Sequence, residues 1–462
     1  MNSISAGKKI VVAGLGKSGV AASKFLAQQG YDVTATDIDP ARQDVAPLLE
    51  SFGIKTEIGF HNLGTFESAD LVVASPGIPL NSEPFQMARS KGIPIRGEMD
   101  IACELIKKPV VAITGTNGKT TVTTMVSKML ESSGKKVFTG GNIGTPLISC
   151  LEKDIRGKFD VPADVVVVEV SSFQLDTATN FAPDVAVLLN ITEDHLNRYP
   201  GFKAYEESKW SIFKNQKKDG YAIINSTITD AEARISGIES LICLFNASAN
   251  PLISNFNSIT NLNILNDFKI DMSASTLLGK HNRENMEAAI MASIFAGGTH
   301  EGIKKILADF KGLPHRTEYV ETINGVNFYD DSKATNTDAV IRAIEAFESN
   351  IILIMGGEEK STDFSVLKPF ITPKVKQIVA MGQARSKLKD ALYDAGANFN
   401  MALSMEDAVR VAFESASYGD TILLSPACAS FDMYKSYAHR GEDFVQKVAG
   451  LKLKYNEKAC NS

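Results

Sequence analysis

The sequence predicts an α/β protein of three domains in series, each built on a mostly parallel β-sheet. Strand and helix patterns alternate along the chain, and two of the strand-to-helix turns are rich in glycine. Two segments that contain a proline interrupt this alternation, Lys107-Lys108-Pro109 and Gly312-Leu313-Pro314. A length of 462 residues suits about three domains of ordinary size. We therefore expect domains at residues 1–108, 109–313 and 314–462.

The amino-acid composition indicates a globular protein and argues against several other classes. With 44% hydrophobic and 22% charged residues, the chain resembles an ordinary globular protein, and a net charge of -6 argues against general nucleic-acid binding. The five cysteines are widely spaced and form no C-x-x-C pair, which favours a reducing cytoplasm over a disulfide scaffold or a zinc site. The N-terminus has no signal-peptide pattern, and the apolar runs are too short to cross a bilayer. We expect a cytoplasmic monomer without a nucleic-acid partner or membrane insertion.

The first domain opens with a glycine-rich turn. Gly14-Leu15-Gly16-Lys17-Ser18-Gly19 follows an apolar strand in the pattern G-x-G-x-x-G, and Asp37 ends the next strand. This arrangement is typical of a Rossmann-like domain that holds a diphosphate at a helix N-terminus. The expected elements are strands at 9–13, 32–36 and 70–75 and a helix at 18–29.

Two kinds of ligand could bind at this glycine-rich turn. A nicotinamide dinucleotide is one of them, but a second phosphate loop follows downstream and no residue pair suited to hydride transfer can be recognised. We therefore favour the diphosphate of another nucleotide. Ser75-Pro76-Gly77-Ile78-Pro79, at the end of a later strand, is expected to line the same crevice.

The central domain begins with a second phosphate loop. Thr114-Gly115-Thr116-Asn117-Gly118-Lys119-Thr120-Thr121 lies between an apolar strand at 110–113 and a helix at 122–130. The glycines let backbone N–H groups face an anion, Lys119 adds a positive charge, and Thr120 offers a hydroxyl to Mg²⁺. The first glycine comes later than in a strict Walker A motif. The loop predicts a nucleoside triphosphate site, with a purely structural turn as the alternative.

Two further strands of this domain end in polar loops. A strand at 165–170 carries Glu169, followed by Ser171-Ser172-Phe173-Gln174, so Glu169 is a candidate Mg²⁺ ligand or else a cap or ion-pair partner. A strand at 185–190 leads to His195, a candidate metal ligand or phosphate contact or else a structural histidine. The remaining expected elements are a strand at 221–225, short edge strands without helices within 226–275, and helices at 282–296 and 301–310.

Two polar helices of this domain are undecided. Glu206-Glu207-Ser208-Lys209-Trp210 has the pattern of a solvated helix face with an ion pair from Glu206 to Lys209. Asn282 and Asn285 share a helix face and suit either an adenine contact or helix capping.

The last domain places three polar loops after strands. They are Asp330 to Asn336, Gly356 to Phe364 and Ser425 to Asp432, and they are expected to meet at the ligand crevice of the sheet. Lys333, Lys360 and Ser430 would suit a small anionic substrate. The expected elements are strands at 326–330, 351–355, 377–381 and 421–425 and helices at 338–347 and 406–415.

Over essentially its whole length the sequence resembles the Mur ligases, and within them the branch that adds D-glutamate. The resemblance is carried by the motifs Gly115 to Thr120, Gly141-Asn142-Ile143-Gly144, Glu169 to Leu175, the His195 loop, Gly279-Lys280-His281-Asn282, His315-Arg316, Asp331 to Asn336 and Ser425 to Ser430. It implies ATP-dependent addition of D-glutamate to UDP-N-acetylmuramoyl-L-alanine, through an acyl phosphate, in cytoplasmic peptidoglycan synthesis. The protein would then act through positioning and charge neutralisation.

The resemblance also implies residue roles. Lys119 would neutralise the β- and γ-phosphates, Thr120 and Glu169 would hold Mg²⁺, and His195 would help to bind a second Mg²⁺. Lys209 matches a lysine that family members carbamylate, which would make it a metal ligand. The implied nucleotide contacts are Gly115, Thr116, Asn117, Gly118, Lys119, Thr120, Thr121, Asn282, Asn285, Arg316 and Asp331.

The implied substrate contacts fall in two groups. Lys17, Ser18 and Asp37 would meet the UDP moiety and Asn142 the muramoyl peptide, whereas Lys333, Thr335, Lys360, Ser430 and Tyr437 would lie near D-glutamate. The chain departs from the family pattern at Ile38-Asp39, where relatives carry a small polar or basic residue after the aspartate, and at Tyr437, where phenylalanine is familiar.

Three other functions remain open at this point. One is a superfamily ligase for a different amino acid or acceptor, although the Asp-Asn-Pro-Arg segment of the diamino-acid branch does not occur. The second is a non-catalytic sensor of ATP and nucleotide sugars, and the third is an NAD-dependent oxidoreductase.

Overall fold

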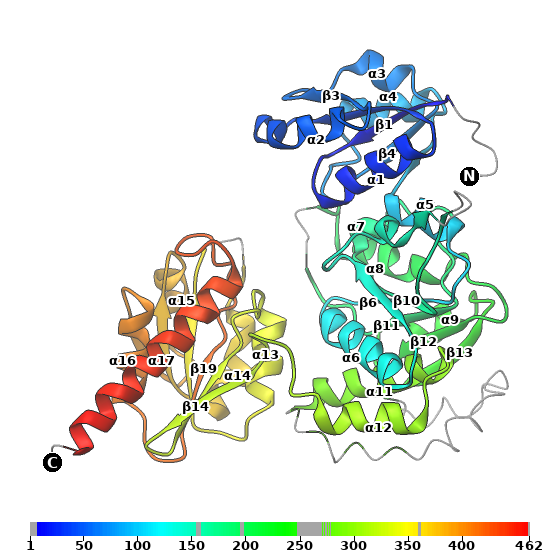
Figure 1. Cartoon of the computed structure of the whole chain (residues 1–462). Coiled ribbons are helices and arrows are strands. Elements are labelled where there is room, and N and C mark those ends of the chain that lie inside the picture. Colours follow the sequence, from blue (N-terminus) through cyan, green and yellow to red (C-terminus); the bar gives the residue numbers. More distant parts are fainter. Residues whose placement is uncertain are drawn as a thin grey trace. The chain divides into compact units, whose positions relative to one another are not determined.

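The computed structural model describes residues 7–153, 159–194, 198–246, 270, 272, 275, 277, 279–358 and 362–460, with the side chains of 456–460 left aside. The chain forms two compact units (Figure 1). The first comprises Met1–Met272 and Glu284–Ala308, and the second comprises Ser273–Arg283 and Asp309–Ser462. None of the described helices combines the length and the apolar character needed to cross a membrane.

The first sheet has five parallel strands in the order β3-β2-β1-β4-β5. The order reverses at β1, which pairs with β2 on one side and β4 on the other, so a crevice is expected at the carboxyl ends of β1 and β4. The elements are β1 (Lys9–Ala13), α1 (Lys17–Gln28), β2 (Asp32–Asp37), η1 (Pro40–Val45), α2 (Ala46–Glu50), β3 (Lys55–Ile58), α3 (Leu63–Glu67), β4 (Leu71–Ala74), α4 (Glu83–Ser90), β5 (Ile95–Arg96) and α5 (Glu98–Leu105).

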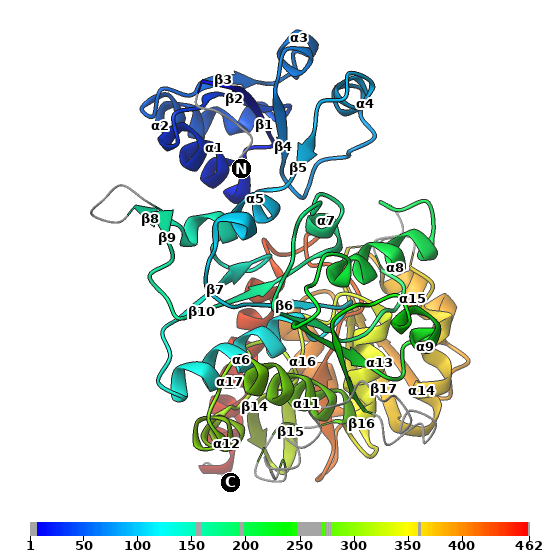
Figure 2. The same ribbon diagram turned by 90° about the vertical axis from the view of Figure 1, so that its right-hand side faces the viewer.

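The second sheet belongs to the same unit and has six parallel strands in the order β13-β12-β11-β6-β10-β7. Helix α6 packs along β10 and β7 (Figure 2). The strands are β6 (Val110–Thr114), β7 (Val137–Gly141), β10 (Val165–Glu169), β11 (Val185–Leu188), β12 (Tyr221–Asn225) and β13 (Leu241–Phe245). The helices are α6 (Lys119–Ser132), η2 (Leu147–Cys150), α7 (Ser172–Leu175), α8 (Phe202–Trp210), η3 (Ser211–Phe213), α9 (Ala231–Ile235), α11 (Lys280–Phe295) and α12 (His300–Asp309), and β8 (Glu152–Lys153) pairs with β9 (Phe159–Asp160).

Burial explains why these segments form parallel strands. All five residues of β6 and of β10 are buried, as expected for strands covered by helices on both faces. The prediction of only short edge strands within 226–275 was partly wrong. Strand β13 is an edge strand, but Ala231–Ile235 is helical, and a helix this short leaves no periodic signal. Most of the later part of that segment lies outside the described residues.

The second unit contains a six-stranded sheet in the order β14-β15-β19-β16-β17-β18, in which only the β14–β15 pair is antiparallel. The strands are β14 (Glu318–Ile323), β15 (Val326–Asp330), β16 (Ile351–Gly356), β17 (Val375–Met381), β18 (Asn398–Met401) and β19 (Thr421–Leu424). The helices are α13 (Thr337–Glu345), η7 (Ser365–Leu367), α14 (Lys368–Lys374), α15 (Arg385–Leu392), α16 (Met405–Glu414) and α17 (Tyr437–Cys460). The sequence predicted neither β14 nor the 24-residue helix α17.

Two apolar layers sandwich this sheet. Leu353 and its i±2 neighbours face α13, α14 and α15, whereas Ile352 and Ile354 face α16 and α17. The alternation follows from the two-residue period of a strand. The sequence-based expectation of α/β domains with mostly parallel sheets is therefore confirmed.

Truncation of a buried leucine in the second unit is expected to cost much more stability than truncation of an exposed one. Leu353 is fully buried in β16, so Leu353→Ala removes packed atoms and leaves a cavity, at a cost of about 2–5 kcal/mol. The matched control Leu403→Ala changes a side chain that is 77% exposed and should cost less than about 0.5 kcal/mol. Urea unfolding of both variants measures the difference, and equal midpoints would contradict this account of the core.

Candidate active site

The loop between β6 and α6 is held in one shape by its own backbone and by the exit of β11. The amide of Thr116 donates to the carbonyl of Asn190 at 3.0 Å, and the amide of Asn117 donates to Oδ1 of Asn190 at 2.8 Å. Gly118 precedes the helix with φ of +85°, and a Cβ there would lie 2.4 Å from Oδ1 of Asn285. Any other residue at this position would be strained by the positive φ and would clash with Asn285, which explains why glycine is found here. The loop presents the N-terminus of α6 to a ligand.

Two lysines converge on one carbonyl of this loop. Nζ of Lys119 donates to the carbonyls of Gly115 at 2.8 Å and Thr116 at 2.7 Å. Nζ of Lys209 donates to the same Gly115 carbonyl at 2.8 Å, and the Lys209 side chain is only 1% exposed. Burial lowers the pKa of Lys209 well below its usual value, and the nearby charge of Lys119 lowers that pKa further.

The expectation of a solvated Glu206–Lys209 pair was therefore wrong. Glu206 pairs instead with Arg234 at 3.1 Å, and Lys209 points inward from the buried side of α8. The i,i+3 spacing of a helix allows an ion pair, but packing of α8 on the sheet decides which way each side chain faces.

Glu169 ends β10 beside the phosphate loop and is 2% exposed. Oε1 of Glu169 accepts a hydrogen bond from the Asn142 amide at 2.7 Å, whereas Oε2 is buried and has no hydrogen-bond partner among the described residues. The alternative of a helix cap does not apply, because Ser171 and Gln174 form the capping box of α7. A buried carboxylate oxygen without a donor suits a hard cation, and Thr120 in the first turn of α6 offers a hydroxyl of the same kind.

A cavity of about 440 Å³ in the first unit brings together the residues expected at the nucleotide sugar. Its lining comes from the loops after β1, β2, β4 and β7 and from α7. The lining residues are Gly14, Gly16, Lys17, Ser18, Asp37, Asp39, Arg42, Ser75, Pro76, Gly77, Ile78, Gly141, Asn142, Gly144, Pro146 and Gln174. Lys17, Ser18, Asp37 and Asn142, which are far apart in the sequence, thus line one space.

Within this cavity Asp37 holds the backbone of two loops. Oδ2 of Asp37 accepts the amide of Leu15 at 2.6 Å, and Oδ1 accepts the amide of Asp39 at 2.9 Å. Ile38 points away and is 62% exposed. The sequence did not identify Arg42 as a candidate, yet its guanidinium lines the cavity from η1. The only sequence signal is one basic residue in the turn after Asp37.

In the second unit, a strained loop carries Arg316. His315 and Thr317 on either side of it have φ of +61° and +46°, which is uncommon for residues with a Cβ and especially so for a β-branched one. The amide of Thr317 donates to Oδ1 of the buried Asp331 at 3.1 Å. Oδ2 of Asp331 accepts from the Ser425 hydroxyl at 2.9 Å, so Asp331 ties the loop to the end of β19.

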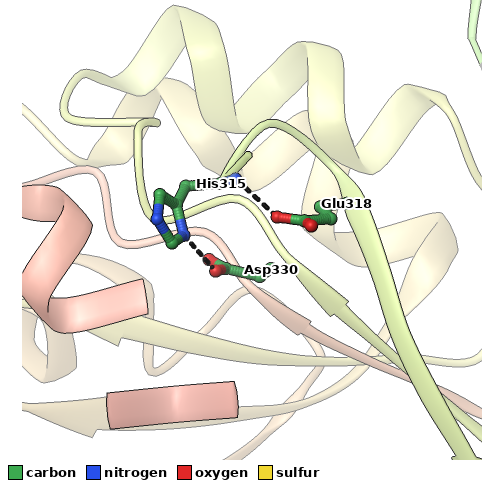
Figure 3. Close-up of side chains that lie close together, drawn as sticks. All are labelled: His315, Glu318 and Asp330. Atoms are coloured by element: carbon green, nitrogen blue, oxygen red, sulfur yellow. Dashed lines mark hydrogen bonds and ion pairs between the residues drawn. The ribbon is translucent and has the colours of Figure 1, made fainter. Parts of the chain in front are cut away.

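His315, Glu318 and Asp330 form the close cluster shown in Figure 3. Their potential ligand atoms lie within 4.8 Å of one another, which would also suit a metal ion. However, Nδ1 of His315 is hydrogen-bonded to Asp330 at 2.6 Å, and Glu318 accepts the His315 amide at 2.8 Å. Because both acids are already hydrogen-bonded to His315, we interpret the cluster as one that stabilises the strained loop.

The residues expected at the amino acid gather around the same sheet edge. Nζ of Lys333 lies 3.9 Å from the ring centroid of Tyr437, a cation–π contact. The amide of Thr335 donates to the Lys333 carbonyl at 2.9 Å, and Ser430 is buried in the loop after β19. Lys360 of the third loop and His195 of the first unit lie outside the described residues.

The asparagines of α11 divide between the units. Asn285 is buried in the first unit beside Gly118, whereas Asn282 belongs to the segment assigned to the second unit, where its amide donates to the carbonyl of Gly279 at 3.2 Å. Arg440, deep in the second unit, is a further functional candidate that the sequence did not indicate. It lies on the unpredicted helix α17, and a lone arginine carries no motif.

Three family models match the chain. They are the N-terminal domain of MurD-like Mur ligases at residues 8–97, the Mur ligase middle domain at 113–293 and the glutamate ligase domain of Mur ligases at 315–428. The UDP-N-acetylmuramoylalanine–D-glutamate ligase of Desulfosudis oleivorans is 46% identical, with 96% of this chain and 97% of that protein covered. The corresponding ligase of Desulfatibacillum aliphaticivorans is 40% identical, with 96% and 99% covered.

Solved structures show the same fold at low sequence identity. UDP-N-acetylmuramate-alanine ligase MurC from Thermotoga maritima matches with a TM-score of 0.55 and 19% identity, covering 96% of this chain and 100% of that one. MurF ligase from Thermotoga maritima, in complex with ADP, matches with a TM-score of 0.56 and 15% identity, covering 92% and 95%.

Asp331→Asn is expected to change how the stability of the second unit depends on pH. Burial raises the pKa of Asp331 to about 7, whereas an unfolded aspartate titrates near ~4, so the folded chain holds the additional proton between these values. The contribution of Asp331 to stability is therefore complete below pH ~4 and is lost as the pH rises through about 7. Asparagine has no carboxyl proton to release, so Asp331→Asn does not show this loss of stability with rising pH.

Urea unfolding of both proteins across this pH range measures the effect. The stability of the wild type relative to Asp331→Asn should fall as the pH rises, whereas the exposed control Asp390→Asn should show no comparable trend. A difference between wild type and Asp331→Asn that stays constant with pH would refute the assignment.

Proposed function

This chain belongs to the Mur ligase family, and on that premise we propose how its residues carry out the reaction. The protein is an ATP-dependent ligase that adds D-glutamate to UDP-N-acetylmuramoyl-L-alanine in peptidoglycan synthesis. The observation that carries the assignment is 46% identity to a D-glutamate ligase over nearly the full length of both chains. The domains at 1–108, 109–313 and 314–462 would bind the UDP substrate, ATP and the amino acid in that order. We propose that the protein works as a cytoplasmic monomer.

The chemistry has two displacement steps. A carboxylate oxygen of the alanyl group attacks the γ-phosphorus of ATP, and the bond to ADP breaks to give an acyl phosphate. The amine of D-glutamate then attacks the acyl carbon, phosphate leaves, and the nitrogen loses a proton to form the amide. Both steps bring negative groups together, so the protein must neutralise charge and align the reactants.

Lys119 is proposed to neutralise the transferred phosphate. Its hydrogen bonds to the Gly115 and Thr116 carbonyls hold the ammonium group over the loop, from which it can turn to the β- and γ-phosphates. The N–H groups at the start of α6 would bind the same phosphates. Asn285 beside the loop, together with Asn282, Arg316 and Asp331, is proposed to contact the rest of the nucleotide.

Glu169, Thr120 and His195 are proposed to hold Mg²⁺, for which the buried and unpartnered Oε2 of Glu169 is the supporting observation. When bound, Mg²⁺ offsets the negative charge of the phosphates during transfer. We propose two such ions. Asn142 would keep Glu169 oriented through its 2.7 Å hydrogen bond while its position on the cavity wall lets it meet the muramoyl peptide.

Lys209 is proposed to react with CO₂ to form a carbamate. Burial lowers the pKa of Lys209 and so favours its neutral amine, which is the form that attacks CO₂. The neutral amine forms the new N–C bond and loses one proton, so the product is a buried anion. Its neighbour Lys119 would favour that anion, because the two positive charges that repel each other are replaced by an opposite pair.

The UDP moiety is proposed to lie in the 440 Å³ cavity. Lys17 and the N-terminus of α1 would bind the diphosphate, with Ser18 donating a hydrogen bond. Asp37 fixes the glycine-rich turn, and Arg42 would supply the cation that Ile38-Asp39 does not. In the second unit, Lys333, Thr335, Ser430 and Tyr437, with Lys360, are proposed to receive D-glutamate.

The amino-acid specificity tests the assignment directly. Phosphate release from ATP in the presence of UDP-N-acetylmuramoyl-L-alanine should be at least ~100-fold faster with D-glutamate than with L-glutamate, glycine or a diamino acid. Lys119→Ala provides the background rate. Clear turnover with another amino acid and none with D-glutamate would refute the assignment.

Lys209→Ala is expected to lower the turnover number by at least ~100-fold, because the variant cannot form the carbamate. Short carboxylates such as formate or acetate should restore part of the activity of this variant by entering the vacated space. Lys203→Ala, which changes an exposed lysine on the same helix, is the matched control and should keep full activity. An undiminished rate in Lys209→Ala would exclude the carbamate.

A further inference from the structure

Arg440 is the largest fully buried side chain of the described part of the protein, with 1% of its surface exposed. It lies in the first turn of α17, behind the sheet edge where the three polar loops of the second unit begin. Among the described residues, no carboxylate lies within ion-pair distance of its guanidinium group. A buried cation without an acidic partner is costly, so its hydrogen bonds must account for its presence.

The hydrogen bonds of this guanidinium go to the end of β16 and to the loops after β15 and β19. Nε donates to the Ser332 hydroxyl at 3.0 Å, and Nη2 donates to the Ser332 carbonyl at 2.9 Å and the Cys428 carbonyl at 3.0 Å. Nη1 donates to the carbonyls of Gly356 and Ala429, both at 3.3 Å. One planar group therefore ties together the loops after β15, β16 and β19.

These acceptors stand directly before residues proposed to bind the amino acid. Ser332 precedes Lys333, Ala429 precedes Ser430, and Gly356 opens the loop that leads to Lys360. Ser332 also donates its hydroxyl to the Tyr437 carbonyl at 2.8 Å, and the Tyr437 ring lies against Lys333. A shift of Arg440 would thus move every described member of the amino-acid site.

The charge of Arg440 is not balanced by direct contact. Burial lowers the pKa of Arg440 to about 10, so the group is still a cation at neutral pH. Asp330, the acid at the end of β15, is already engaged by His315. Asp432 is a second acid near the guanidinium and accepts the Gln383 amide at 2.9 Å. Because neither acid forms an ion pair with Arg440, its positive charge would attract a substrate that carries two carboxylates.

We propose that Arg440 is the positioning residue of the amino-acid site, holding its three loops in register and favouring an amino acid with two carboxylates by charge. The inference rests on the proposed function only in naming D-glutamate as that amino acid. Lysine at this position keeps the positive charge but lacks the planar set of N–H donors of the guanidinium group, and methionine has neither.

Steady-state kinetics of Arg440→Lys and Arg440→Met test the proposal. The KM for D-glutamate should rise by roughly 10-fold in the lysine variant and roughly 100-fold in the methionine variant, while the KM values for ATP and the UDP substrate stay within about 2-fold. The matched control is Arg410→Lys, because Arg410 is 53% exposed and, within the described part of the chain, pairs only with Asp407 and Glu414 on its own helix. Equal increases in all three KM values, or none, would overturn the proposal.

Hydrogen exchange of the Arg440→Lys protein gives a second readout that does not depend on turnover. One amide per loop is informative: Lys333 bonded to the His315 carbonyl, Glu358 bonded to the Ala429 carbonyl and Tyr434 bonded to the Ser430 carbonyl. All three should exchange roughly 10-fold faster than in the wild type, and none should change in Arg410→Lys. Unchanged exchange in Arg440→Lys overturns the proposal. If exchange rises in Arg440→Lys but the wild type is inactive with D-glutamate, the proposal stands and the proposed function is rejected.

Discussion

The burial of parallel strands on both faces is the constraint on which the rest of the structure depends. Strands such as β6 and β10 have no exposed face, so their polar chemistry can appear only where they end. Each sheet therefore delivers its functional loops at the carboxyl ends of its strands. The phosphate loop follows β6, Glu169 ends β10, and Lys333 and Ser430 follow β15 and β19. The chemistry of the protein is concentrated at these edges because the sheets leave little other room for it.

Three charged side chains at these edges are buried, and the cost of burying the charge is offset differently in each of them. One oxygen of Glu169 accepts a hydrogen bond from the Asn142 amide, and the other has no hydrogen-bond partner among the described residues. The pKa of Lys209 is lowered by burial and by the nearby Lys119, which disfavours its positive charge. Arg440 remains a cation by directing its donors at the carbonyls of strand ends. In water none of these arrangements would be needed, and in the protein each one orders a neighbouring loop.

The sequence predicted the α/β class, most buried strands and the phosphate loop, because apolar runs and glycine spacing are local signals. It did not predict β14, which is half-exposed, or α17, although the Ser436 hydroxyl caps this helix by accepting the His439 amide at 3.1 Å. The residues around Lys209 have the pattern of a solvated helix face and left its role undecided, and the structure shows that its side chain is buried. Arg440 could not have been found, because its acceptors lie at the end of β16 and in the loops after β15 and β19, which are far apart in the sequence.

The sequence by itself therefore determined what kind of protein this is. Its motifs carried the resemblance to the Mur ligases, and the glycine-rich turns predicted two phosphate sites, because such signals lie within a few consecutive residues. Only the tertiary structure decided which side chains share an environment. It placed Lys17, Asp37 and Asn142 on one cavity, Lys119 and Lys209 on one carbonyl, and three loops on one guanidinium. Those relations depend on burial and on contacts between distant segments, which set pKa values and orientation and which no local pattern contains.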